Sequence, residues 1–458
     1  MPTELSTELS TELSTQLSAQ MPAQASTHKQ AKGAISTSHW LATKAGADAI
    51  EAGGTAIDAA LAAAATLCVV YPNNVALGGD LVALVKSPDG KVHFLNGTGT
   101  APAAQTVATL QAKHGSALPL RGIDSVTVPG GVCGWNSLHE LGSKLSWSAH
   151  FEEAIKHAKN GVPVARSVAA SIKAELPHLE ADPGCRNIFL ADGKPLKFGD
   201  NLVQPQLAQT LSRLAENGSY EFYEGEVAKA WVTGLQRLGS KITLQDAKEF
   251  NAQWEQPLEG NFEGYKVVTS PPNTSGFALL RALQSITNKG IDDPLGRGAG
   301  ELTKVFHASN AVRAAYLADP NFGGLSGAEL IAMEAPTTQE NGLHPTGDTV
   351  GLSAVTADGW AISLINSVYH GFGACILEPN TGILFQNRGT SFSLDENSPN
   401  VFQGGKRPRH TLMPVLVFKD NELVFVPATM GGYRGVDGRA VAHRPVSHRL
   451  APRKGGAG

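Results

Sequence analysis

The chain lacks the features typical of membrane, redox and metal-binding proteins. Its 458 residues include only four cysteines, without a Cys-x-x-Cys pair or a His/Cys ligand spacing. No apolar run reaches the roughly 18 residues of a membrane span, and the N-terminus lacks the basic and apolar regions of a signal peptide. We therefore expect a cytoplasmic protein without a metal site, in which disulfides are the less favoured state of Cys68, Cys133, Cys185 and Cys375.

Strong positive charge is also missing from the body of the chain. The net charge is −4, the sequence pI is about 6.4, and basic residues do not alternate with aromatic ones. Nucleic acid is therefore not an expected partner. The glycine-rich stretches LGGD (77–80) and GGLSG (323–327) lack the spacing of dinucleotide or phosphate loops, so we expect no cofactor. A hydrophobic content of 42% is sufficient for a large core.

Residues 1–35 form a low-complexity extension that begins with TELSTELSTELSTQLS. Leucine at every fourth position could give a thin helical stripe, but one leucine per turn buries little surface. We expect this extension to be disordered.

Regular patterns in the remaining chain predict a mixed fold. Residues 42–70 read as two helices separated by a Gly-Gly turn, and helical patterns dominate residues 135–260. Strands are predicted at 264–270 and on both sides of the turn at 357–359. Helices outside hairpin-rich sheet segments are typical of an α+β protein, here a four-layer αββα sandwich.

Asp58 lies within an otherwise apolar, alanine-rich helix. By composition alone, its carboxylate is expected to face solvent. The alternative is a buried carboxylate that accepts hydrogen bonds from backbone N–H groups.

Thr349 is the candidate nucleophile. It follows the polar, Gly/Pro-containing run ENGLHPTGD (340–348) and opens a predicted strand pair. If the Asp348–Thr349 bond were cut, the new α-amine of Thr349 could act as the base for its own hydroxyl group. The alternative is an ordinary strand threonine.

This segment resembles the start of the small subunit in the γ-glutamyltransferase family of N-terminal-nucleophile hydrolases. Further blocks resemble the family in the same order, at 42–84, 125–135, 151–164, 270–276, 405–414 and 428–432. The resemblance implies an αββα sandwich with a large-subunit region at 36–348 and a small-subunit region at 349–432. It also favours the buried role of Asp58 and implies self-association of the two processed fragments.

The family's catalytic roles fall on four residues of this chain. The resemblance implies that Thr349 is the nucleophile, that the Ser367 hydroxyl hydrogen-bonds to it, and that the N–H groups of Gly431 and Gly432 bind the oxyanion. A strand serine and a simple glycine turn are the alternatives for the last three residues.

The positions that bind the glutamyl head group in the family are altered here. Thr98 replaces an arginine, Arg388 and Ser391 replace a glutamine and an aspartate, Tyr369 replaces an asparagine, and His410 and Thr411 replace two serines. The alternatives are a surface salt bridge for Arg388 and simple packing for Tyr369. For His410 a structural role is favoured over that of a general base, because the terminal amine already serves as the base. The combined pattern is similar to the oxamate amidohydrolase-like branch.

These observations predict a self-processing amidohydrolase or acyltransferase that acts on a small amide, with Arg388 binding a substrate carboxylate. γ-Glutamyl transfer or glutathione hydrolysis is the first alternative. The second is an inactive homologue, because residues 433–458 form a basic tail, rich in arginine with one aspartate, where the resemblance ends. Such a change in composition predicts a truncated or frameshifted chain whose sandwich is incomplete at the C-terminus.

Overall fold

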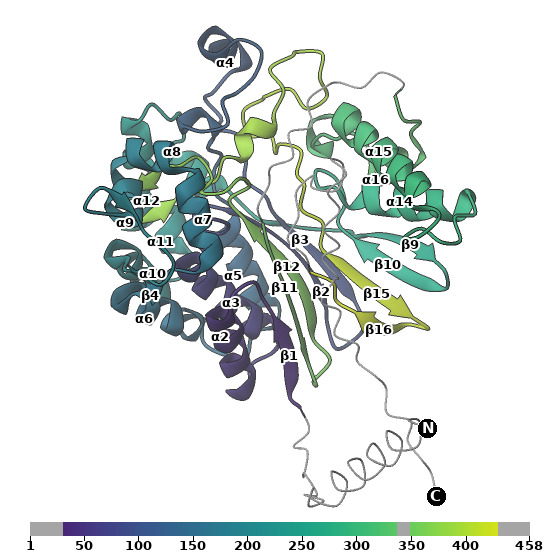
Figure 1. Ribbon diagram of the computed structural model, residues 1–458, viewed down its shortest axis with the longest axis horizontal. Helices are drawn as coiled ribbons and strands as arrows, with labels where there is room; N and C mark the ends of the chain where they lie inside the picture. The colour runs from purple at the N-terminus through teal and green to yellow at the C-terminus, as the bar shows by residue number, and fades with distance from the viewer. Residues whose placement is uncertain (1–30, 337–348, 429–458) are drawn as a thin grey trace, which may run out of the picture. The chain divides into compact units, whose positions relative to one another are not determined.

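The computed structural model describes residues 31–336 and 349–428. Within these residues the chain forms two antiparallel sheets stacked between two groups of helices (Figure 1). The larger sheet contains, in spatial order, β1 (Gly33–Ser36), β11 (Val350–Thr356), β12 (Ala361–Ser367), β2 (Asp80–Lys86), β3 (Val92–Gly97) and β8 (Gln253–Glu255). The smaller sheet contains β16 (Glu422–Phe425), β15 (Val415–Lys419), β10 (Tyr265–Thr269) and β9 (Leu258–Phe262). The expected αββα sandwich is confirmed.

The large helical layer covers the outer face of the larger sheet. Helices α2 (Trp40–Glu51), α3 (Ala56–Val70) and α5 (Gly131–Gly142) contact its strands directly. Outside or beside them lie α4 (Val107–His114), α6 (Glu152–Asn160), α7 (Arg166–Ala174), α8 (Leu176–Ala181), α9 (Pro183–Phe189), α10 (Pro205–Asn217), α11 (Tyr220–Tyr223), α12 (Glu226–Arg237) and α13 (Leu244–Glu249).

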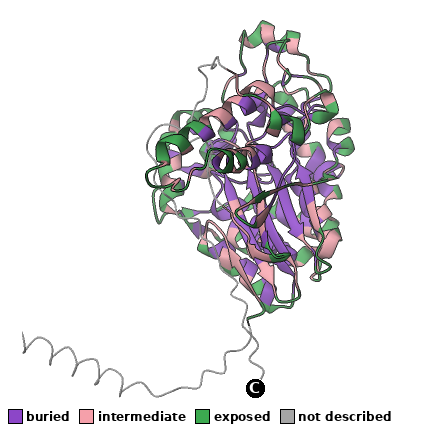
Figure 2. Cartoon of the chain, turned by 90° about the vertical axis from the view of Figure 1, so that its right-hand side faces the viewer, coloured by how far each residue is buried: buried purple, intermediate pink, exposed green. Residues whose placement is uncertain are grey.

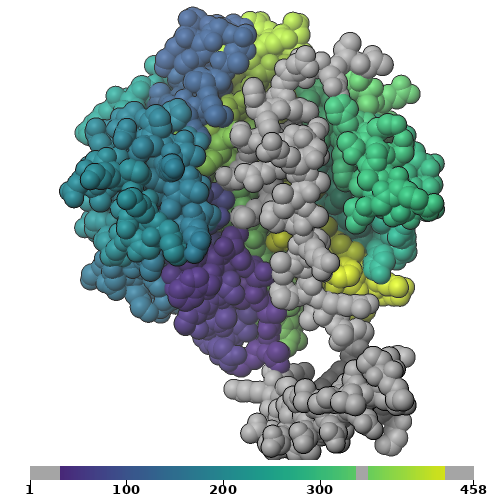
Figure 3. Space-filling view, in the orientation of Figure 1, coloured from purple at the N-terminus to yellow at the C-terminus, as the bar shows by residue number. Residues whose placement is uncertain are grey.

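The smaller sheet is covered by α14 (Gly276–Asn288), α15 (Ala299–Tyr316) and α16 (Gly327–Ala332). In the space-filling view these helices, coloured green, and the purple-to-teal helices lie on opposite sides (Figure 3). The remaining short elements are η1 (Ile123–Ser125), η2 (Trp147–Phe151), β4 (Val162–Pro163), β5 (Leu190–Ala191), β6 (Lys194–Pro195), β7 (Asn201–Leu202), η3 (Pro320–Phe322), β13 (Leu377–Glu378), β14 (Ile383–Leu384) and η4 (Arg388–Ser391).

Strand β2 contributes side chains to both hydrophobic cores of the sandwich. Leu81 and Ala83 belong to the core between the sheet and the helices, whereas Val82 and Leu84 pack toward Leu416 of the smaller sheet. Because side chains alternate along a strand, an apolar run such as LVALV buries both faces of the sheet. Figure 2 shows these central strands buried and the outer surfaces of the helices exposed.

Strand β1 corrects one predicted boundary. It begins at Gly33 and pairs with β11 along its whole length, so folded structure begins inside the range assigned to the extension. Gly33 itself allows this close pairing, because a Cβ there would lie 2.4 Å from the carbonyl oxygen of Val355. Residues 1–30 and the tail at 433–458 lie outside the described residues.

Asp58 is completely buried at the start of α3, so the solvent-facing interpretation is wrong. Its carboxylate accepts hydrogen bonds from the N–H groups of Thr55, Lys144 and Leu145 and from His150 Nε2 at 2.9 Å. Burial alone would raise the pKa of Asp58, but the His150 and backbone donors together hold this pKa well below its usual range. The carboxylate thereby ties α3 to the loop after α5.

The four cysteines are free thiols, as expected; three are buried and Cys133 is half-buried. Across residues 31–336 and 349–428, no helix is long and apolar enough to cross a membrane.

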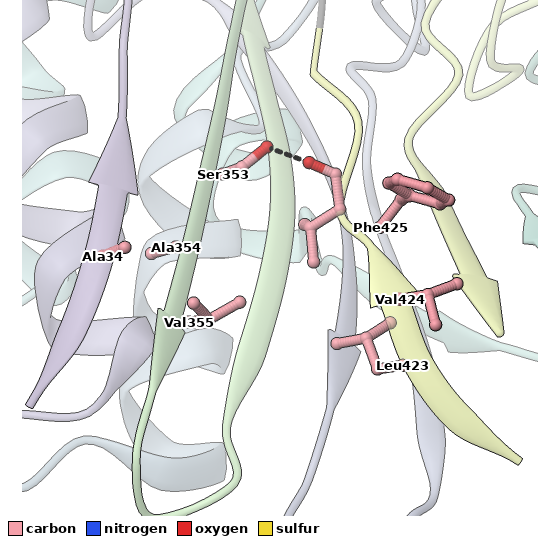
Figure 4. A pocket seen from close by; sticks show the side chains of 8 residues that line it. Ala34, Ser353, Ala354, Val355, Leu423, Val424 and Phe425 are labelled. Atoms are coloured by element: carbon pink, nitrogen blue, oxygen red, sulfur yellow. Dashed lines mark hydrogen bonds between the residues drawn. The ribbon is translucent and has the colours of Figure 1, made fainter. Parts of the chain in front are cut away.

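An apolar groove lies between β1, β11 and β16 (Figure 4). It is lined by Ala34, Ala354, Val355 and residues 423–426, and at one end the Ser353 hydroxyl donates to the Val426 carbonyl at 2.8 Å. The side chains that line this groove carry no titratable group, so it provides no catalytic acid or base.

Asp58→Asn should destabilise the protein by about 3–5 kcal/mol, because the amide keeps only one acceptor oxygen and leaves some of the buried donors to Asp58 unpaired. Urea unfolding at neutral pH measures this loss. Because the pKa of Asp58 is lower in the folded than in the unfolded protein, its contribution to the free energy of unfolding is fully present above the unfolded pKa of about 4. This contribution is lost as the pH falls from there through the folded pKa.

The control for this measurement is Glu226→Gln, which breaks the exposed Glu226–Lys229 pair on α12. It should leave the unfolding midpoint unchanged. Equal midpoints for wild type and Asp58→Asn would contradict the structural role of Asp58.

Candidate active site

Two hydroxyl groups meet where β11 begins and β12 ends. Thr349 directly precedes β11, and Ser367 is the last residue of β12. The register that pairs Val350 with Asn366 brings the Thr349 and Ser367 Oγ atoms to 3.1 Å, within hydrogen-bonding distance. Both residues are buried. The structure thus places the predicted nucleophile beside its predicted hydroxyl partner.

Tyr369 connects this hydroxyl pair to the next part of the site. Its backbone N–H donates to Ser367 Oγ at 2.9 Å, and its φ of +79° lies in the left-handed region that side chains disfavour. This turn places the aromatic ring against Arg388, whose guanidinium carbon is 3.5 Å from the ring centroid. A cation–π contact of this kind stabilises a desolvated guanidinium by about 2 kcal/mol.

Arg388 is 1% exposed, so its interpretation as a surface salt bridge is wrong. Its Nη atoms donate to the hydroxyls of Ser391 and Thr411, each at 3.3 Å, while its buried Nε has no hydrogen-bond partner. Among the described residues, no carboxylate lies within 4.0 Å of the guanidinium. Burial lowers the pKa of Arg388 to about 10, so the group remains a cation at neutral pH.

The structure brings together four of the six predicted substrate-binding residues. Tyr369, Ser391 and Thr411 each contact Arg388 directly. Thr98 instead donates its hydroxyl hydrogen bond to Asn96 Oδ1 at 2.7 Å. It does not replace the charge of the arginine found in the family.

His410 is completely buried and lies 3.0 Å from a carboxylate oxygen of Asp80. Burial and the nearby Arg388 charge lower the pKa of His410 well below its ordinary value, so the ring is neutral. The structural rather than basic role of His410 stays a prediction.

Asp80 and Gln386 are functional candidates that sequence reasoning missed. Asp80 lies within the LGGD block and Gln386 immediately precedes the Asn-Arg pair, but nothing in the local sequence distinguishes either one from an ordinary polar residue. Only the fold brings them to Arg388. The two glycines predicted to bind the oxyanion, Gly431 and Gly432, lie outside the described residues, as does Asp348.

This geometry is suited to covalent catalysis on a small anionic acyl group. A threonine hydroxyl with a hydroxyl partner can serve as a nucleophile when an amine acts as its base. The buried Arg388 guanidinium, which stacks on the Tyr369 ring, has N–H donors in one plane that match the two oxygens of a carboxylate.

The chain is similar to known proteins over most of its length. A sequence model of the gamma-glutamyltranspeptidase family matches residues 42–443, so the family pattern extends past residue 432, where the resemblance was expected to end. The "Glutathione hydrolase-like YwrD proenzyme" of Bacillus subtilis is 36% identical over 414 residues, covering 87% of this chain and 78% of the relative.

Two further relatives act on different amides according to their names. The "Oxamate amidohydrolase proenzyme" of Klebsiella pneumoniae is 33% identical over 427 residues, covering 89% of this chain and 80% of the relative. The crystal structure of a cephalosporin acylase from Bacillus halodurans superposes with a TM-score of 0.81 at 31% identity, covering 88% of this chain and 78% of the other.

Ser367→Ala should slow any reaction of the Thr349 hydroxyl, including self-cleavage, because the variant removes the hydrogen bond that orients it. The ground-state loss is about 0.5–1.5 kcal/mol, with a larger effect in the transition state. The rate of fragment formation, followed by intact mass, measures this effect.

Ser363→Ala is the matched control, since Ser363 lies on the same strand and its buried hydroxyl donates to the Pro427 carbonyl at 3.0 Å. Both variants should lose similar stability, but only Ser367→Ala should react more slowly. Equal reaction rates in the two variants would remove Ser367 from the site.

Proposed function

The chain belongs to the gamma-glutamyltranspeptidase family of N-terminal-nucleophile hydrolases, and from this premise we propose that it is a self-processing amidohydrolase for a small carboxylate-bearing amide. Cleavage between Asp348 and Thr349 makes Thr349 the N-terminus of the second fragment. Its α-amine then takes the proton from its own hydroxyl, which attacks the amide carbon.

Maturation by cleavage is supported by the position of Thr349 and by two relatives. Thr349 follows residues 337–348 and directly precedes a buried strand, so a break at this point would leave the strand register intact. The two sequence relatives described above are both named as proenzymes.

The substrate class is carried by one observation, the buried Arg388 guanidinium without a carboxylate partner among the described residues. Burying an unpaired charge is costly, and a bound carboxylate offsets that cost. The Ser391 and Thr411 hydroxyls, which accept hydrogen bonds from Arg388, are further polar groups beside the guanidinium. A relative named oxamate amidohydrolase supports a substrate in which the amide and the carboxylate are adjacent.

The reaction proceeds in two covalent steps. Thr349 Oγ forms an ester with the acyl group and ammonia or an amine leaves with the proton held by the α-amine. Water then attacks the ester and the same amine accepts the proton of this water. The amine passes this proton to Thr349 Oγ as the bond to the acyl carbon breaks and the acid is released. Tyr369 and Arg388 keep the acyl carboxylate on the side of the Ser367 hydroxyl throughout.

Thr349→Ala should abolish both cleavage and turnover, because one oxygen serves in each reaction. Thr349→Ser should retain part of both, since it keeps a hydroxyl at the same position. Intact mass of the purified protein and ammonia release from oxamate measure the two reactions. Appearance of the fragments 1–348 and 349–458 in the Ala variant would contradict the assignment of Thr349.

The enzyme should hydrolyse oxamate with a higher kcat/KM than a γ-glutamyl anilide, since Thr98 does not supply the arginine that binds the glutamyl head group. Arg388→Gln should lower kcat/KM for oxamate by about 30-fold or more, because truncating one partner of a buried charged contact costs about 2–5 kcal/mol.

Arg388→Lys is the matched variant that keeps the charge but loses the planar arrangement of donors. Its kcat/KM for oxamate should fall between those of wild type and Arg388→Gln. A kcat/KM for the γ-glutamyl anilide equal to or above that for oxamate would instead favour glutathione hydrolysis, the activity in the name of the Bacillus subtilis relative.

A further inference from the structure

Asp80 is a buried carboxylate from which two separate chains of contacts lead to Arg388. It is 1% exposed, it begins β2, and the sheet register places it opposite Ser367. One carboxylate oxygen accepts the Gly99 N–H at 2.9 Å and the Gln386 side-chain amide at 3.2 Å. The other oxygen faces His410 at 3.0 Å.

The first chain of contacts runs through Gln386. The Gln386 amide nitrogen donates to Asp80, and its carbonyl oxygen accepts the backbone N–H of Arg388 at 2.5 Å. The Asp80 carboxylate therefore fixes the side chain that holds the main chain of Arg388.

The second chain of contacts runs through His410. The ring is fixed between the Leu412 N–H, which donates to Nδ1 at 3.4 Å, and Asp80, so the proton of the neutral ring lies on Nε2 and is donated to Asp80. The next residue, Thr411, accepts a hydrogen bond from Arg388 Nη2. The Asp80–His410 contact thus positions the hydroxyl that orients the guanidinium.

Asp80 also lies within electrostatic reach of the Arg388 charge. The charged and titratable groups around Asp80 are Arg388 of η4, Arg407 and His410 of the loop before β15, and Tyr223 of α11. Burial raises the pKa of Asp80 to about 7, while Arg388 and the Gly99 N–H limit this rise. The negative charge of Asp80 in turn raises the pKa of Arg388.

Resting on the proposed function, we propose that Asp80 and His410 form one positioning pair for Arg388, and that this pair takes up one proton from solvent when a substrate carboxylate binds to the guanidinium. Without substrate, the Asp80 charge acts on Arg388 only at longer range, without a direct ion pair. A substrate carboxylate competes for the same positive charge and repels Asp80. The Asp80–His410 pair then binds a proton, which removes the repulsion between the Asp80 carboxylate and the substrate carboxylate.

The direction of the pH dependence follows from this competition. Substrate binding raises the pKa of the pair, so an anionic substrate binds most tightly at a pH below the free-enzyme pKa of about 7. Above this pH the KM for oxamate should rise by up to about tenfold per pH unit. Oxamide, the neutral diamide of the same size, should show no such rise. The ratio of the two KM values cancels the titration of the Thr349 amine, which acts on both substrates.

The experiment measures the KM for oxamate divided by the KM for oxamide, in the full-length protein, between about pH 6 and 9. In wild type the ratio should increase with pH, and in Asp80→Asn it should be independent of pH because the titrating carboxyl is gone. His410→Gln, which disrupts the same pair from its other member, should reduce the slope as well. A slope that is absent in wild type, or unchanged in Asp80→Asn and His410→Gln, overturns the proposal.

Asp58 and His150 provide a matched control, since they form an equally buried pair at 2.9 Å with a structural role in the helical layer. His150→Gln should lower the midpoint of urea unfolding. In its folded molecules the KM ratio should rise with pH as steeply as in wild type. A general loss of packing would change the slope in all these variants and would contradict the specific role of Asp80 and His410.

A substrate-independent measurement separates failure of this proposal from failure of the proposed substrate class. If wild type hydrolyses neither oxamate nor oxamide, the substrate class is wrong, and the pair is tested by the pH titration of the His410 ring in ¹⁵N-histidine-labelled protein. His410→Gln identifies the resonance. Arg388→Gln should shift the midpoint upward by about one pH unit or more, because the nearby positive charge is removed, whereas Arg388→Lys should shift it less. An unchanged midpoint in Arg388→Gln overturns the proposal.

Discussion

The hydrogen-bond register of three neighbouring strands is the constraint on which the candidate site depends. β11 pairs with β12 and β12 pairs with β2, and these pairings bring Thr349, Ser367 and Asp80 to the same end of the larger sheet. A slip of one residue would turn every side chain of a strand to the opposite face. Such a slip would place the apolar residues of β2 in the wrong layers, so the packing of the two cores also fixes the geometry of the site.

Local sequence patterns predicted the elements but not the contacts between them. The two N-terminal helices, the strand at 265–269 and the hairpin that follows Thr349 depend on periodicity and turn residues, which neighbouring residues determine. The burial of Asp58 and Arg388 depends on residues far away in the chain. Asp80 and His410, for example, are 330 positions apart, so no local pattern links them. The resemblance to a family identified candidate positions, but the stacking of Tyr369 on Arg388 depends on how the turn after β12 packs against η4, which the sequence does not specify locally.

The site concentrates several energetically unfavourable features in one place. A cation is buried, a tyrosine adopts left-handed backbone geometry, and a carboxylate lies in the interior next to a neutral histidine. Each costs free energy on its own and persists because the surrounding sheets and helices hold it. The Asp58–His150 pair shows the contrasting case, in which three backbone donors satisfy a buried carboxylate that has no access to a substrate.

Strands from the two sides of the Asp348–Thr349 junction lie within the same two sheets. β11 and β12 lie between β1 and β2, and β15 pairs with β10, so strands of the two regions pair with each other at three strand–strand contacts. A chain break at this junction would therefore yield an obligate heterodimer rather than two separable domains. Its interface would be a domain interior, with main-chain pairing and apolar cores in common. Neither piece would be a folding unit of its own, and only denaturants would be expected to release one from the other.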